Sequence, residues 1–225
     1  MTEEEWLTSR NHWELLRLVG PQLSDRKLRL LQVAYCRRMW DLIPDERWRD
    51  AVRVAERYAD KKASDKMRLA ALDRMRDSAR TLDVSALSAA GAANHKTMER
   101  RNYVKYGGAA LFVGETARRS ARDPARGEEA YTLAYRNEND AEAHLVREVF
   151  GNPFRPVAAD PSWRTSTVVA LAQQMYESRD FAPMPVLADA LQDAGCDNEE
   201  VLAHCRGPGP HVRGCWVVDL LLGKE

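Results

Sequence analysis

Helix starts and helix stops recur along this chain, and they constrain its fold more than any other feature. Thr2 precedes Glu5 by three residues, the spacing of a capping box, and Gly20-Pro21 and Gly223 are typical helix ends. No stretch of useful length alternates apolar and polar residues as a half-buried strand does. The sequence therefore predicts an all-α fold of about eight to ten helices.

Apolar residues recur at three- and four-residue intervals between these starts and stops, which is the period of one helical face. Two such series are Leu28, Leu31, Tyr35, Met39 and Leu42, and Trp48, Val52, Ala55 and Tyr58. Helices of this length are marginal alone, so their stability must come from packing their apolar faces together. The predicted architecture is a multi-helix bundle with a compact carboxy-terminal helical unit.

Two regions are expected along the chain. Residues 1–138 form an amino-terminal helical region, in which 64–138 is the least regular part. Asn139-x-x-Glu142 has the spacing of a helix start, and residues 139–225 are expected to form the compact unit packed on the first region. Short helices are predicted there within residues 165–178, 184–194, 198–205 and 215–222.

Charge and composition exclude several classes of protein. The 34 Lys and Arg residues balance 34 Asp and Glu residues, which leaves no global field to attract a polyanion. With 44% hydrophobic and 30% charged residues the chain is neither disordered nor collagen-like, and no apolar run reaches the length of a membrane span. The acidic start lacks the features of a secretory signal, so we expect a cytoplasmic protein with reduced cysteines.

Five potential zinc ligands lie close together near the end of the sequence. They are Cys196, His204, Cys205, His211 and Cys215. Imidazole and thiolate groups are the usual ligands of zinc, so a metal site is one interpretation. The cysteine spacings match no common zinc knuckle, and neighbouring residues on a helix project about 100° apart. The sequence therefore favours the alternative, in which the thiols are small buried apolar groups and the histidines form local hydrogen bonds.

A thiol-dependent enzyme is another interpretation of the same segment. Cys215 stands near the start of the last predicted helix, where the helix dipole lowers a thiol pKa, and His211 precedes it by four residues. Such a nucleophile also needs a cleft and an orienting third group. The apolar residues 216–218 beside the thiol indicate burial, so the sequence favours a protein that is not an enzyme.

Arginines in the predicted turns offer partners for nearby carboxylates. The candidates for structural ion pairs are Arg155, Arg206 and Arg213 with Asp189, Asp193 or Asp219. Asp189 and Asp193 also share a helical face and could act as an acid and base pair, although a solvated face is the commoner role of that spacing.

Basic and aromatic side chains alternate within residues 95–126, a pattern that could stack on single-stranded nucleic acid. Acidic residues interrupt this stretch, so a solvated helix surface is the favoured interpretation and nucleic acid is not the expected partner.

Several longer motifs stand out in the two regions. They are GNPFRPV at 151–157, ADALQDAGC at 188–196 and HCRGPGPHVRGCWVVDLLLGK at 204–224, with SDRKLRL at 24–30, CRR at 36–38 and AERYAD at 55–60. These motifs resemble a large family of uncharacterised bacterial proteins that is abundant in planctomycetes and present in actinomycetes. The resemblance implies no activity, cofactor or catalytic residue. The broad expansion of such a family is more typical of recognition or regulatory proteins than of housekeeping enzymes.

Together these patterns predict a non-catalytic module that binds an unidentified protein partner or regulates one. The alternatives are a zinc-binding or thiol-dependent enzyme built on residues 196–215, and a single-strand nucleic-acid binder built on residues 95–126.

Overall fold

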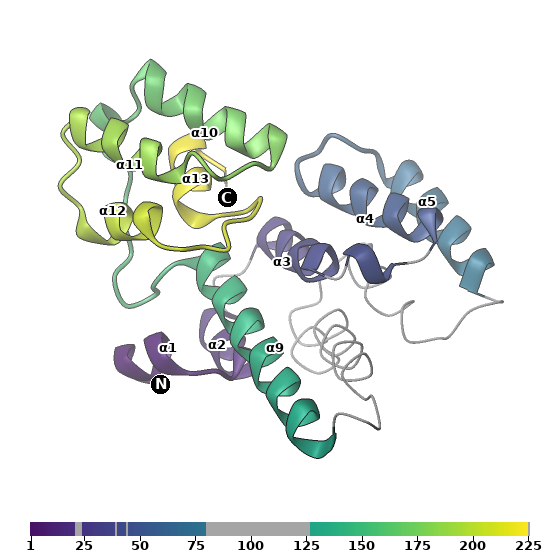
Figure 1. The fold of residues 1–225 in the computed structure, drawn as a ribbon. Coiled ribbons are helices and arrows are strands. Elements are labelled where there is room, and N and C mark those ends of the chain that lie inside the picture. Colours follow the sequence, from purple (N-terminus) through teal and green to yellow (C-terminus); the bar gives the residue numbers. More distant parts are fainter. Residues whose placement is uncertain (21–23, 39, 44, 80–126, 225) are drawn as a thin grey trace. The chain divides into compact units, whose positions relative to one another are not determined.

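The computed structural model describes residues 1–20, 24–38, 40–43, 45–79 and 127–224 (Figure 1). These residues form ten α-helices and two short 3-10 helices, and none of them lies in a β-strand. The predicted all-α fold is thus confirmed for the described part of the chain. The basic and aromatic stretch at 95–126 lies outside the described residues.

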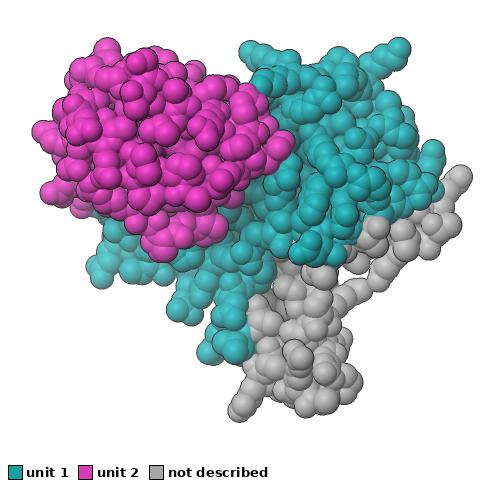
Figure 2. All heavy atoms as spheres, turned by 45° about the horizontal axis from the view of Figure 1, so that its top comes forward, with its two compact units in different colours: residues 1–146 teal, residues 147–225 magenta. Residues whose placement is uncertain are grey.

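Contacts divide the chain into two compact units, Met1–Val146 and Arg147–Glu225, which Figure 2 shows in different colours. The predicted region boundary at residue 139 falls inside the helix α9 (Gly127–Phe150), and the last turn of α9 belongs to the second unit.

The prediction that a helix starts at Asn139 is wrong, because α9 begins well before it at Gly127. Asn139 is half-buried, while Glu138 beside it is buried and forms an ion pair with Arg38, 2.9 Å between the nearest atoms. Asparagine inside a helix destabilises it by only about 0.7 kcal/mol relative to alanine. Contacts made by neighbouring residues outweigh this local preference for a helix start.

The first unit consists of α1 (Glu3–Thr8), α2 (His12–Val19), α3 (Asp25–Arg38), the 3-10 helix η2 (Trp40–Leu42), α4 (Glu46–Ala59), α5 (Asp65–Ala79) and most of α9. Thr2 and Glu5 form the predicted capping box: the Thr2 backbone N–H donates to Glu5 Oε2 at 2.7 Å, and the Glu5 N–H donates to Thr2 Oγ1 at 3.2 Å. Gly20 ends α2 in a right-handed conformation, not the left-handed one that the Gly-Pro pair suggests.

The second unit contains the 3-10 helix η3 (Pro161–Trp163), α10 (Ser166–Ser178), α11 (Met184–Asp193), α12 (Glu199–Arg206) and α13 (Trp216–Leu222). The four α-helices lie where the sequence predicts them. In Figure 1, α11 packs on α12, and α13 contacts both α10 and α12. Their apolar faces share one core, which includes Val168, Tyr176, Leu187, Leu191, Val201, Val217 and Leu221.

No described helix has both the length and the hydropathy needed to cross a bilayer.

Asn198 caps α12, because its side-chain oxygen accepts a hydrogen bond from the Val201 N–H at 3.1 Å. Replacing Asn198 with alanine is expected to destabilise the protein by about 1 kcal/mol, since one N–H at the helix start loses its acceptor. Asn198→Asp restores an acceptor and should stay close to wild type. Urea unfolding of the three proteins checks this order, and equal stability of Asn198→Ala and wild type would contradict it.

Candidate metal centre

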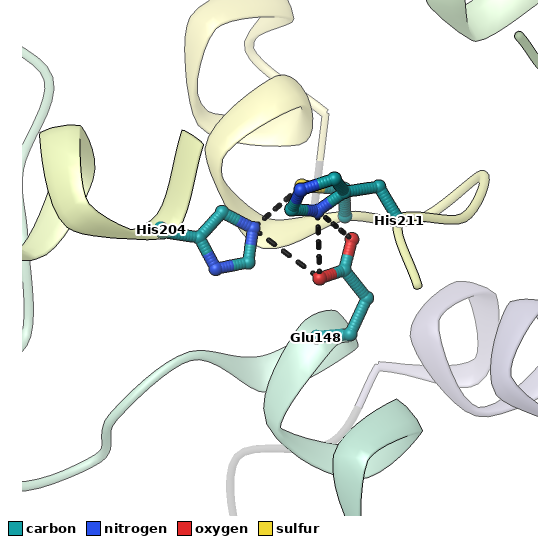
Figure 3. Close-up of side chains that lie close together, drawn as sticks. Glu148, His204 and His211 are labelled. Atoms are coloured by element: carbon teal, nitrogen blue, oxygen red, sulfur yellow. Dashed lines mark hydrogen bonds and ion pairs between the residues drawn. The ribbon is translucent and has the colours of Figure 1, made fainter. Parts of the chain in front are cut away.

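Four side chains with metal-binding atoms converge inside the second unit. Glu148 comes from the last turn of α9, His204 from α12, His211 from the connection between α12 and α13, and Cys215 from the position just before α13. One ligand atom from each lies within 4.8 Å of the others. Figure 3 shows both imidazole rings turned toward the Glu148 carboxylate.

Local backbone structure places Glu148 at an abrupt helix end. Gly151 follows with a φ of +67°, and its N–H donates to the Arg147 carbonyl at 2.8 Å. A Cβ at Gly151 would lie 3.1 Å from the Trp216 ring, so only glycine lets this ring pack so closely. The end of α9 is therefore held against the start of α13.

The connection between α12 and α13 carries His211 toward the same carboxylate. Gly209 has a φ of +72° and precedes a cis peptide bond to Pro210. The Val212 N–H donates to Glu148 Oε1 at 3.2 Å, and the Cys215 N–H donates to the Val212 carbonyl at 2.9 Å. This turn brings the Cys215 sulfur back toward Glu148.

The distances within the cluster are slightly shorter than those between the ligands of one small cation. His211 Nδ1 lies 3.1 Å from Glu148 Oε2, and His204 Nε2 lies 3.3 Å from the same oxygen and 3.1 Å from Cys215 Sγ. Ligand atoms around a tetrahedral zinc ion are about 3.4 to 3.6 Å apart, given ordinary zinc bond lengths. The set of one oxygen, two nitrogens and one sulfur is one that zinc accepts.

Burial sets the protonation state of the four side chains when no cation is bound. The Cys215 side chain is fully buried, and burial, together with the nearby Glu148, raises the pKa of its thiol well above the ordinary value. Burial lowers the pKa of His204 to about 4. Without a cation the thiol is therefore protonated and His204 is neutral at pH 7. A bound cation would lower the pKa of the Cys215 thiol, because a thiol that coordinates a metal ion is deprotonated.

This protonation state does not suit nucleophilic catalysis. The thiolate is the reactive form of cysteine, and a fully buried thiol with a raised pKa does not supply it. A hollow in the first unit, of about 660 Å³, is lined by residues between Met1 and Leu18, and none of the four side chains belongs to it.

All three thiols of the candidate set are buried in the apolar core of the second unit, and both histidines form hydrogen bonds, as the favoured interpretation of the sequence expects. His204, His211 and Cys215 also meet at Glu148. Cys196 and Cys205 fill the apolar core of the second unit, and burial raises the pKa of Cys205 to about 12.

Sequence reasoning missed Glu148 altogether. A signal was present, because Glu148 follows Leu145 by three residues and lies on the apolar face of its helix, among buried side chains. A carboxylate at such a position is almost never buried without a partner.

One of the predicted arginine pairs is formed by Arg206, which contacts Asp189 at 3.3 Å on the exposed surface. Arg155 pairs with Glu200 at 2.9 Å, and Arg213 lies 3.7 Å from Glu177 and over the Tyr176 ring. Of the remaining candidates, Asp193 is exposed on α11 and Asp219 is buried on α13.

Comparisons with models of protein families, with curated proteins and with solved structures found no match for this chain.

Proposed function

We propose that residues 147–225 form a zinc-binding helical unit and that the protein is a non-catalytic recognition or regulatory module. Glu148, His211 and Cys215 hold the ion, and His204 completes the coordination. The observation that carries the proposal is the convergence of four donor atoms, from the end of α9, from α12 and from the connection between α12 and α13, within 4.8 Å of one another.

The donor set favours zinc over the harder cations. Magnesium and calcium bind oxygen ligands and would gain little from a thiolate and two imidazoles. Zinc binds all three kinds of ligand and accepts four-coordinate geometry.

Closed coordination supports a structural role for the ion. Catalytic zinc keeps one position for water or substrate, whereas four protein ligands leave none. The ion would join the end of α9 to α12 and to the 207–215 connection, segments that apolar packing and a few hydrogen bonds also hold together. All four cysteines of the chain are free, which supports a reducing compartment such as the cytoplasm.

Metal content of the purified full-length protein tests the proposal. After removal of bound metal and dialysis against zinc, we expect one zinc ion per chain, measured by elemental analysis. Cobalt(II) should give the intense visible absorption of tetrahedral coordination and a sulfur-to-cobalt charge-transfer band. Both signals should be lost in Cys215→Ala.

Cys196→Ala is the matched control, since Cys196 is also a buried thiol of this unit but lies outside the cluster. It should bind one ion like wild type. A folded wild-type protein that binds neither zinc nor cobalt, or Cys215→Ala binding as wild type does, would overturn the proposal.

A further inference from the structure

The indole of Trp216 donates a hydrogen bond to the candidate ligand His204, on the side of the ring away from the cluster. The distance from Trp216 Nε1 to His204 Nδ1 is 3.0 Å. Figure 3 shows the other ring nitrogen, Nε2, directed at Glu148.

This hydrogen bond decides where the imidazole proton sits. An indole N–H is a donor only, so the atom that receives its hydrogen bond, Nδ1, carries no proton. In the neutral ring the proton is therefore on Nε2, the nitrogen that faces Glu148 and Cys215. Metal-ligating histidines show the opposite arrangement, in which the nitrogen remote from the metal donates its proton to an acceptor.

We infer that Trp216 opposes metal coordination by His204, so that ion binding at the site is weakened and is coupled to the hydrogen bond of the indole. The inference rests on the proposed zinc site. When Nε2 gives its lone pair to the ion, the ring proton moves from Nε2 to Nδ1. Two N–H donors then face each other, and the hydrogen bond between Trp216 and His204 is lost.

Trp216 cannot turn away without a wider change. Its ring packs against Gly151 at the end of α9, and the residue is the first of α13, next to Cys215. Breaking the indole hydrogen bond therefore disturbs the packing between the end of α9 and the start of α13. Metal binding at Nε2 is coupled to that packing, which converts metal occupancy into a structural change in the unit.

Zinc affinities of four full-length proteins test the inference: wild type, Trp216→Phe, His204→Ala and the double variant. Phenylalanine keeps an aromatic ring on Gly151 but removes the N–H. Trp216→Phe should therefore bind zinc about two- to tenfold more tightly than wild type, measured by competition with a chromophoric chelator. His204→Ala should bind more weakly, and adding Trp216→Phe to it should change the affinity no further, because Trp216 acts through His204.

The outcomes separate this inference from the proposed function. Zinc binding by wild type with no gain in Trp216→Phe, or with an equal gain in the His204→Ala background, overturns the role of Trp216 and leaves the metal site standing. A folded wild-type protein that binds no zinc overturns both.

Nuclear magnetic resonance of the wild-type protein gives a second readout that does not depend on the folding of a variant. The indole N–H resonance of Trp216, assigned by triple-resonance spectra, should move upfield when one equivalent of zinc is added, as its hydrogen bond is lost. An unmoved Trp216 resonance in a sample that has bound zinc would overturn the inference.

Discussion

Replacing Glu148 with alanine should destabilise the second unit by about 3 kcal/mol in metal-free buffer and should also abolish zinc binding. Glu148 is 5% exposed, forms hydrogen bonds with the Val212 N–H and His211 Nδ1, and lies 3.3 Å from His204 Nε2. Without the carboxylate the Val212 N–H and His211 Nδ1 lose this partner in a buried site. Urea unfolding with a chelator present measures the stability, and dialysis with elemental analysis measures the bound zinc.

Glu177→Ala is the matched control, because Glu177 lies in the same unit but its side chain is 46% exposed. It should change the stability by no more than about 0.5 kcal/mol and leave zinc binding intact.

Glu148→Gln separates the two roles of the carboxylate. Glutamine keeps the shape and can still accept from Val212, so the loss of stability should be smaller than with alanine, while zinc binding should still be lost. A Glu148→Ala protein as stable as wild type would contradict the hydrogen-bonding role. Unchanged zinc affinity in both variants would exclude Glu148 as a ligand.

The helices of the second unit could be predicted because their starts and ends depend on nearby residues. Thr165 and Asn198 each accept a hydrogen bond from an N–H three residues later, and Gly223 ends α13 in the left-handed conformation. Such signals are readable in any sequence. The sequence predicts the start of α9 at the wrong place because Asn139 resembles a cap, whereas the neighbouring Glu138 pairs with the distant Arg38 from within the helix.

The candidate metal centre could be predicted only in part, for a related reason. His204, His211 and Cys215 are close in sequence, so the sequence groups them as candidate ligands. Helix geometry predicts that His204 and its neighbour Cys205 project from different sides of α12. It does not predict which of the two faces the cluster. Glu148 could not be found by spacing, because only the tertiary fold brings the end of α9 to the connection between α12 and α13.

His12→Ala is expected to have a comparably large effect in the first unit, about 3 kcal/mol of lost stability at pH 7. His12 Nδ1 lies 2.8 Å from Glu142 Oε2, and the two side chains are 6% and 2% exposed. Removing the imidazole leaves a buried carboxylate without this partner. His144→Ala is the matched control, because His144 is exposed on the same helix as Glu142 and should change little.

The pH dependence of stability tests the pairing of His12 with Glu142 more directly. Burial raises the pKa of Glu142 above its ordinary value of 4.5, so acid protonates this carboxyl in the folded protein. Glu138 acts in the same direction, whereas His12 and Arg38 oppose it, so the loss of His12 raises the pKa further. A carboxyl with a raised pKa in the folded state contributes stability that is complete below pH 4.5 and is lost as the pH rises through the raised value.

At pH 7, His12→Ala should therefore be less stable than His12→Ala/Glu142→Gln, which has no carboxyl to bury. The difference should close as the pH falls from 7 toward 4.5, measured by urea unfolding at several pH values. A constant difference, or one that widens on acidification, would show that Glu142 is not the charge that His12 stabilises.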